Sequence, residues 1–162
     1  MRFFRGKTFM LLMLTFFLVG CGSSKMVKQP IEGTAQLSKY EINKIKCETE
    51  GVPEHFLSAV QGHLKAELSK RSLLSNEANS TSNKVDITVV SYRMRSGFSR
   101  MMFGVFAGKD GIESTVKVLE PATGKVIGES NVSSFNVTAV GNEDDIARMH
   151  AQEIAKFLAK ED

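Results

Sequence analysis

The stretch "IESTVKVLEPATGKVIGESNVSSFNV", residues 112–137, decides the fold class because it combines two strand-like segments with a turn. Residues 112–120 are rich in β-branched side chains, which favour extended structure. The motif "PATG", residues 121–124, supplies a proline and a glycine, which a type I turn favours at its second and fourth positions. The residues after the turn return as a second strand, in which Gly128 is interpreted as a bulge, because the apolar positions change parity around it. The stretch therefore predicts a β-hairpin.

The residues upstream of this hairpin predict two more strands with a helix between them. Apolar side chains alternate along residues 85–95, which favours a strand. Residues 39–47, "KYEINKIKC", mix apolar and charged side chains and are also interpreted as a strand. Between them, apolar residues recur every four positions over residues 53–73, which predicts an amphipathic helix. Pro53 suits the first turn of that helix.

The chain ends in a second predicted helix, which begins near Asn142. Asn142 is a good N-cap residue, and the acidic residues 143–145 complement the helix dipole. The element order is β-α-β-β-β-α, in which a strand, a crossover helix and a strand suggest a parallel pair. The predicted fold is therefore α/β (α+β), a two-layer sandwich with a mixed four-stranded sheet and two helices on one face.

The N-terminal residues have the pattern of a secretory signal. Arg2, Arg5 and Lys7 precede an uncharged apolar run of 12 residues, 8–19. As a helix this run would span roughly 18 Å at about 1.5 Å per residue, whereas a bilayer core is about 30 Å thick. The run is too short for a stable membrane span and suits the apolar region of a signal peptide.

The quartet Leu18-Val19-Gly20-Cys21 resembles a bacterial lipobox, in which the cysteine thiol is acylated and becomes the new N-terminus. An ordinary signal peptide with an incidental cysteine is the alternative. The resemblance implies lipid (palmitate or a related acyl chain) on Cys21, and two or more acyl chains give stable anchoring at about 0.8 kcal/mol per buried CH₂. Residue 22 is glycine rather than the aspartate of inner-membrane retention, so we expect anchoring at the periplasmic face of the outer membrane.

We expect three segments along the chain: a signal peptide over residues 1–20, a lipidated cysteine with a flexible tether over 21–36, and one α/β domain over 37–162. The tether is predicted from its polar composition, followed by Pro30 and Gly33. Extended at about 3.3 Å per residue, it could hold the domain some 40–50 Å from the membrane.

Charge and cysteine content limit the possible functions. Removing residues 1–20 removes three of the 21 basic residues and no acidic ones, which leaves 18 of each sign. A neutral mature chain gives no electrostatic reason to expect nucleic-acid binding. Once Cys21 is lipidated, Cys47 is the only other cysteine, so no intramolecular disulfide can form. Cys47 is interpreted as a buried apolar residue, with a surface thiol or a nucleophile as alternatives.

Several short motifs together resemble bacterial lipoproteins that carry the domain of unknown function 4410. They are "GVPEHF" before the first helix, "SYRMRSGFSRMMFGVFAG" at residues 91–108, "PATGKVI" and the closing amphipathic helix. Arg100, Gly104, Gly108, Thr123 and Gly124 occupy matching positions. The resemblance implies an envelope lipoprotein with no assigned chemistry.

Residues 97–108, "GFSRMMFGVFAG", combine large apolar side chains with three glycines around Arg100. One interpretation is structural, with glycines that let the backbone bend and apolar side chains that fill the core. The other is an exposed contact patch of Arg100, Met102, Phe103 and Phe106 that inserts into a partner or the lipid interface. A phosphate-binding loop is disfavoured because the spacing of its glycines is absent.

The sequence indicates no catalytic, cofactor or metal site. The histidines, His55, His63 and His150, lack metal-ligand spacing and are interpreted as partly exposed. No GxSxG motif is present. Arg93, Arg95 and Arg100 form a small basic group, which could bind lipid headgroups or glycan carboxylates or could simply be solvated.

These observations favour a membrane-anchored envelope lipoprotein that is not an enzyme and acts as a binding or assembly module. Its expected partners are the membrane, through lipid on Cys21, and an envelope protein or peptidoglycan, with no nucleic acid. One alternative is a small envelope hydrolase or ligand-binding enzyme, which would need a deep pocket lined by convergent polar groups. The other is an oligomeric structural or stress-related lipoprotein that associates through exposed sheet edges.

Overall fold

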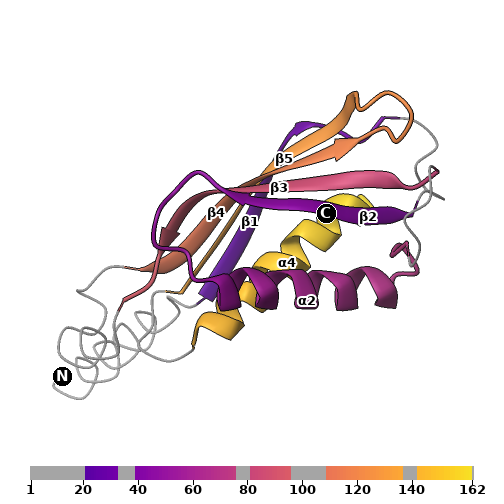
Figure 1. The fold of residues 1–162 in the computed structure, drawn as a ribbon. Coiled ribbons are helices and arrows are strands. Elements are labelled where there is room, and N and C mark those ends of the chain that lie inside the picture. The colour runs from indigo at the N-terminus through magenta and orange to yellow at the C-terminus, as the bar shows by residue number, and fades with distance from the viewer. Residues whose placement is uncertain (1–20, 33–38, 76–80, 96–108, 137–141, 162) are drawn as a thin grey trace, which may run out of the picture.

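A computed structural model describes residues 21–32, 39–75, 81–95, 109–136 and 142–161 of the chain. These residues form five strands and two helices in a two-layer α+β arrangement (Figure 1). In chain order the elements are β1 (Cys21–Gln29), β2 (Tyr40–Cys47), α2 (Glu54–Lys70), β3 (Asn83–Arg93), β4 (Asp110–Leu119), β5 (Val126–Asn136) and α4 (Glu143–Ala159). Each strand and helix predicted from periodicity lies within a few residues of its predicted position.

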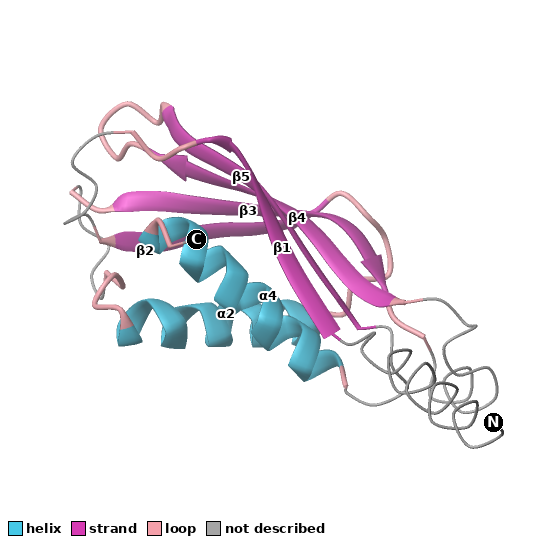
Figure 2. Ribbon diagram, turned by 180° about the vertical axis from the view of Figure 1, so that it is seen from behind, coloured by secondary structure: helices cyan, strands magenta, loops and turns pink. Residues whose placement is uncertain are grey.

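The strands form one mixed sheet in the order β1-β5-β4-β3-β2. Strands β2 and β3 are parallel and joined through α2, whereas β3, β4, β5 and β1 pair antiparallel in turn. Both helices lie on the same face of the sheet (Figure 2). No helix or strand of the described residues covers the opposite face, which we call the uncovered face. The predicted fold class, the parallel pair and the single helical face are therefore confirmed.

The prediction of four strands and a flexible tether from residue 21 is wrong, because Cys21–Gln29 forms a fifth strand, β1, along the free edge of β5. The segment is polar, but its polar groups have partners in the helix layer. Ser23 Oγ donates a hydrogen bond to Glu153 Oε2 over 2.9 Å, and Lys25 Nζ donates to the backbone oxygen of Glu161. Such an edge strand carries no apolar alternation, so composition alone suggested a linker.

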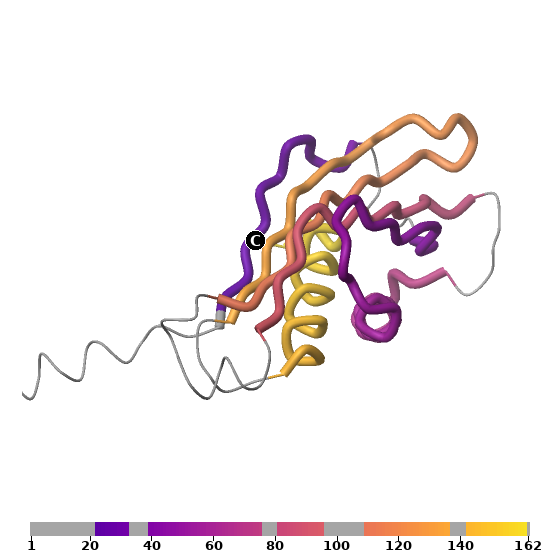
Figure 3. The backbone as a smooth tube through the Cα atoms, turned by 60° about the vertical axis from the view of Figure 1, so that its left-hand side comes forward, coloured from indigo at the N-terminus to yellow at the C-terminus, as the bar shows by residue number. Residues whose placement is uncertain are grey.

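The apolar core lies between the sheet and the two helices. Every second residue of β4 from Asp110 to Val118 is buried, and β5 alternates in the same way. In α4 the buried side chains include Ile146, Ile154 and Leu158. Because a strand turns successive side chains to opposite faces, the intervening residues lie on the uncovered face. Figure 3 shows the backbone of α2 and α4 on the other side of the strands.

The predicted bulge in the second arm of the hairpin is confirmed. Val118 pairs with Gly128, but Leu119 pairs with Val126, so Ile127 is the extra residue. The glycine is needed because Ile31 lies against it, and a Cβ at position 128 would approach Ile31 Cγ1 to 2.6 Å. The bulge therefore makes room for the chain that leaves β1.

The termini of the two helices also follow from their sequences. Asn142 and Asp145 form a reciprocal capping box at the start of α4, as the predicted N-cap suggested. Helix α2 begins directly after Pro53. Within the described residues, neither helix has the length and hydropathy needed to cross a bilayer.

Candidate functional site at the Cys21 end of the sheet

Cys21, the residue that the sequence predicts to be lipidated, lies at one end of the sheet. Cys21 is the first residue of β1 and pairs with Asn136, the last residue of β5, which in turn pairs with Asp110, the first residue of β4. Arg95 follows β3 at the same end and contacts Asp110. We call the end defined by these four residues the anchor end.

The anchor end also carries both ends of the segment that contains the predicted contact patch. Arg95 precedes residues 96–108 and Lys109 follows them. The patch itself, Arg100, Met102, Phe103 and Phe106, lies outside the described residues. Cys21 and the base of the patch segment are thus close together, although 75 residues separate residue 21 from residue 96 in the sequence.

A buried ion pair holds the base of that segment together. Arg95 Nε donates to Asp110 Oδ1 over 3.0 Å and Arg95 Nη2 donates to Asp110 Oδ2 over 3.1 Å. The backbone N–H of Arg95 donates to the same carboxylate over 2.6 Å. Both side chains are almost wholly buried, at 3% and 1% exposure. The interpretation of Arg95 as part of a solvated or ligand-binding basic group is therefore wrong, because its guanidinium is committed to Asp110.

His150 forms a second buried polar cluster next to the anchor end. Its Nε2 lies 2.7 Å from Ser114 Oγ of β4 and its Nδ1 lies 3.2 Å from Ser134 Oγ of β5. Burial lowers the pKa of His150 to about 3, so the imidazole is neutral at physiological pH. The prediction that His150 is partly exposed is wrong.

The serine–histidine contact is not arranged for nucleophilic catalysis. His150, Ser114 and Ser134 are each at most 1% exposed, so a substrate has no access to them in this fold. Both ring nitrogens face hydroxyl groups, whereas a catalytic histidine is normally oriented by a carboxylate or another polar group behind it. The cluster instead joins α4 to β4 and β5 through satisfied hydrogen bonds.

The other two histidines connect the helices. His55 Nε2 lies 3.0 Å from Glu143 Oε2, and His63 Nε2 lies 2.8 Å from Asp144 Oδ1. Tyr92 OH donates to the other oxygen of Glu143 over 3.3 Å. These contacts join α2 and β3 to the first turn of α4. In the described part of the chain, no three histidine, cysteine, aspartate or glutamate side chains converge on a point where a metal ion could bind.

Cys47 ends β2 as an exposed free thiol, so the interpretation of this residue as a buried apolar side chain is wrong. Partial burial nevertheless raises its pKa. The thiol therefore lacks the depressed pKa that distinguishes a nucleophilic cysteine.

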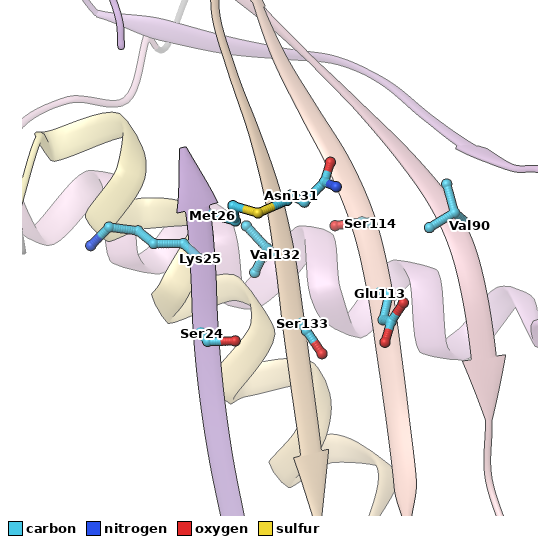
Figure 4. Close-up of a pocket in the computed structure, with 9 residues that line it drawn as sticks. All are labelled: Ser24, Lys25, Met26, Val90, Glu113, Ser114, Asn131, Val132 and Ser133. Carbon is cyan, nitrogen blue, oxygen red and sulfur yellow. The ribbon is translucent and has the colours of Figure 1, made fainter. Parts of the chain in front are cut away.

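The uncovered face of the sheet is hollowed by a pocket of about 230 Å³ across β1, β5, β4 and β3. Figure 4 shows its lining residues on these neighbouring strands, with the helices behind the sheet. Met26 and Val90 are the exposed apolar side chains of this pocket, at 60% and 42% exposure. Hydroxyl, amide and carboxylate groups surround them, from Ser24, Asn131, Ser133 and Glu113. This mixture suits a contact surface rather than a reaction centre.

Sequence reasoning missed the buried polar groups, although one signal was available. The alternation that makes Ile112 and Val116 inward-facing also assigns Asp110 and Ser114 to the buried face of β4. A carboxylate at an inward position requires a cationic partner, because an unpaired buried charge is costly. Which arginine supplies that partner could not be read from the sequence.

Comparisons with known proteins identify a family and a fold. Residues 31–140 match the family model described as "Domain of unknown function (DUF4410)". A dodecamer structure of PelC from Paraburkholderia phytofirmans, with 13% identity, has a TM-score of 0.61 and covers 85% of this chain and 97% of that one. A second PelC dodecamer from the same organism has 11% identity, a TM-score of 0.60 and coverage of 85% and 96%. At these identities the likeness concerns the fold alone.

A third structure, a candidate lipoprotein from Caulobacter crescentus CB15, has 15% identity and covers 70% of this chain and 88% of that one. Its TM-score of 0.41 is too low to establish a shared fold. No curated protein matches the chain.

Proposed function

Since the chain belongs to the family of the domain of unknown function DUF4410, we propose that it is a non-enzymatic binding or assembly lipoprotein of the bacterial envelope, anchored by lipid on Cys21. One observation carries the proposal: the cysteine of the lipobox-like quartet is the first residue of β1 and pairs with Asn136 at the anchor end. The anchor and the base of the predicted contact segment therefore belong to one rigid sheet.

The mechanism is positioning at short range. Acyl chains on Cys21 would partition into the bilayer at about 0.8 kcal/mol per buried CH₂, which makes release rare when two or more chains are attached. Because β1 begins at Cys21, no linker separates the lipid from the sheet. The anchor end would thus rest at the membrane surface, together with Arg95 and Lys109, the residues that flank 96–108 in the sequence.

Mass spectrometry of the protein purified from its native membranes tests the anchor. We expect a chain that begins at Cys21 and carries a diacylglycerol and an additional acyl group. Cys21→Ser should accumulate as an uncleaved, unlipidated precursor, whereas the matched control Cys47→Ser should be processed like the wild type. A mature chain with another N-terminus or a bare Cys21 thiol would refute the proposal.

We further propose that Arg100, Met102, Phe103 and Phe106 contact an envelope protein or peptidoglycan. The support is the rigid base of their segment, where the Arg95–Asp110 pair joins its two flanks. In-cell crosslinking of the intact lipoprotein should capture a partner, and the double change Phe103→Ser and Phe106→Ser should abolish capture without loss of folding. Unchanged capture by the double variant would contradict this role.

The outer membrane is the proposed location, on its periplasmic face. The support is Gly22, which is not the aspartate of an inner-membrane retention signal. Gly22 also has a packing role, because a Cβ there would lie 3.0 Å from the ring of Phe135. Separation of the two membranes by density should recover the protein with outer-membrane markers, and recovery with inner-membrane markers would overturn the assignment.

Oligomerisation is a second candidate property, favoured by two observations. Structures with this fold are PelC dodecamers. In addition, β1 and β2 are the edges of the five-stranded sheet, so each has one side without a strand neighbour among the described residues. Exposed edges of this kind can pair with another chain. Native mass spectrometry of the lipidated protein in detergent should then show a defined multimer, and a monomer at all concentrations would exclude it.

A further inference from the structure

We propose that the uncovered face of the sheet binds phospholipid headgroup phosphates beside the lipid anchor, through Arg93 and Lys109 against Phe135. This inference rests on the proposed anchoring of the chain through Cys21. It assigns to the folded domain itself a direct contact with the membrane surface.

Strand register brings this site next to Cys21. Gly22 pairs with Phe135, Phe135 pairs with Gly111, and Gly111 pairs with Arg93, so these four residues form one row across β1, β5, β4 and β3. Neighbouring strands are about 4.8 Å apart, so the row extends roughly 14 Å sideways from β1. It lies one residue along β1 from Cys21. A lipid that holds Cys21 at the bilayer would therefore hold the β1 end of this row close to the membrane surface.

The row lines a pocket of about 110 Å³ on the uncovered face. Arg93, Lys109 and Phe135 contribute to its walls, together with the hydroxyl-bearing residues Ser91 and Ser133. Lys109 Nζ lies 4.8 Å from the centre of the Phe135 ring, in a cation–π contact that positions the ammonium group over the pocket wall.

Gly111 keeps the floor of the pocket open. A Cβ at this position would approach the backbone oxygen of Ser134 to 3.0 Å and Phe135 Cβ to 3.4 Å. A side chain here would therefore occupy the space between the flanking strands where a ligand would rest.

The chemistry of the lining fits a phosphate diester. A guanidinium group matches the planar, bidentate geometry of phosphate oxygens, and a lysine adds a compact positive charge. Serine hydroxyls can donate further hydrogen bonds. Arg93 and Lys109 are the cations and Glu113 is the carboxylate among the described lining residues. An aromatic ring such as that of Phe135 is favourably placed at the boundary between water and lipid.

The acidic residues at the start of α4 lie in the other layer of the fold. Glu143, Asp144 and Asp145 belong to the first turn of α4, on the covered side of the sheet. Each contacts a basic side chain: His55, His63 and Arg148 respectively. The basic pocket and the acidic helix terminus therefore face opposite sides, which favours contact of the sheet face with an anionic surface.

The test uses Phe135→Trp as a reporter in the full-length, natively processed chain, because the sequence contains no tryptophan. The protein is reconstituted into vesicles of phosphatidylethanolamine and phosphatidylglycerol whose acyl chains are brominated close to the glycerol. We expect the bromines to quench the introduced indole. The double change Arg93→Gln and Lys109→Gln should remove most of this quenching while the protein still sediments with the vesicles.

The matched control is Lys44→Gln with Lys117→Gln, which removes the same charge from another pocket of the same face. Lys117 is six residues along β4 from Gly111, about 20 Å at 3.4 Å per residue, so quenching should persist. If circular dichroism shows that Phe135→Trp does not fold, Ser91→Trp, at an exposed position in the pocket lining, replaces it as the reporter.

The outcomes separate this inference from the proposed function. A chain that does not sediment with vesicles refutes the anchor. A chain that sediments but shows no quenching, or quenching that does not depend on Arg93 and Lys109, overturns the headgroup site and leaves the anchor intact. A response of the indole to inorganic phosphate without vesicle quenching would assign the pocket to a soluble anion and also overturn the lipid assignment.

Discussion

At the scale of single residues, His150 is a titratable group at a buried position, where protonation of the imidazole is energetically unfavourable. The imidazole is fully buried, and its two nitrogens meet the hydroxyls of Ser114 and Ser134. A neutral ring has one donor and one acceptor nitrogen, and a hydroxyl can complement either. Protonation would place a charge in the core with two neutral partners, so the folded state resists it.

This arrangement predicts that the free energy of unfolding falls as the pH drops below 6.5. The unfolded histidine takes up a proton near its ordinary pKa of 6.5, whereas the folded pKa is about 3. The contribution of His150 to the free energy of unfolding is therefore fully present above pH 6.5. Below that pH it declines by about 1.4 kcal/mol per pH unit, because one proton is taken up on unfolding. Urea unfolding at pH 7 and pH 5 measures the effect.

His150→Gln is the control, because it removes the titrating ring and should flatten the pH dependence. Carboxylates contribute little to the pH dependence of the free energy of unfolding between pH 7 and pH 5. Hydrogen bonds from Lys70 and Arg71 lower the pKa of Glu67 to about 2, so its contribution is lost only below its ordinary value of 4.5. Equal slopes for the wild type and His150→Gln would contradict the role assigned to His150.

The Arg95–Asp110 pair predicts a large loss of stability for Asp110→Asn. Removal of one partner leaves the other charge buried without compensation, which costs about 3–5 kcal/mol. Chemical denaturation measures the loss. Glu32→Gln is the control, because Glu32 pairs with Lys125 at 3.8 Å in an exposed position. Such a pair contributes at most about 1 kcal/mol. Equal losses for both variants would show that the buried pair is not structurally important.

At the scale of elements, the start of α4 depends on its capping box. Asn142 Oδ1 accepts a hydrogen bond from the Asp145 backbone over 2.9 Å, and Asp145 Oδ2 accepts one from the Asn142 backbone over 3.1 Å. Asn142→Ala should therefore lower the free energy of unfolding by about 1 kcal/mol, whereas Asn142→Ser should retain most of the cap. Thermal unfolding of both variants checks this, and an alanine variant as stable as the serine variant would contradict it.

The contact between the end of β1 and the bulge of β5 predicts opposite effects for two glycine substitutions. Gly128→Ala places a Cβ within 2.6 Å of Ile31 Cγ1 and 3.1 Å of its Cα, so the chain after β1 must move. We expect a loss of about 1–3 kcal/mol, as for other overpacked sites. Gly62→Ala in α2 meets nothing within 4 Å and should stabilise the helix by up to about 1 kcal/mol. Comparison of the two denaturation midpoints tests the contact, and equal stability of Gly128→Ala and wild type would refute it.

Periodicity explains which elements could be predicted from the sequence. The four-residue spacing of the apolar residues Phe56, Val60, Leu64 and Leu68 indicated α2. This spacing is present because one face of the helix is buried, and all four side chains lie on that face. Strand β1 gave no such signal, because it is held by hydrogen bonds to β5 and polar contacts with α4, which do not produce a periodic apolar pattern. Contacts between segments more than a hundred residues apart, such as Ser23 with Glu153, leave no local pattern to detect.

At the scale of the whole molecule, the family could be predicted from the sequence, but the geometry of the site could not. The lipobox-like quartet predicts Cys21 as the lipid anchor from four adjacent residues, and this stays a prediction. The row that joins Gly22 to Arg93 depends on strand order, and β1 lies beside β5 rather than beside its neighbour in sequence. Arg93 and Arg95, two residues apart, illustrate the limit, since Arg95 is buried against Asp110 and Arg93 is exposed.

The balanced charge of the mature chain that we propose predicts which treatment would release it from the membrane. With 18 basic and 18 acidic residues after position 20, long-range attraction to an anionic surface is weak. Salt screens charges but does not weaken the burial of acyl chains. Washing membranes with concentrated salt should leave the protein bound, and mild detergent should release it. Release by salt alone would indicate a peripheral electrostatic attachment instead of the lipid.

The pairing of Cys21 with Asn136 also sets an order of events in time. The two residues are 115 positions apart, so β1 cannot join the sheet until the chain is complete as far as residue 136. Closing so long a loop is slow compared with local folding. If Cys21 is the lipid anchor that we propose, a signal peptidase and an acyltransferase would act on it during that interval, while its strand is still unpaired.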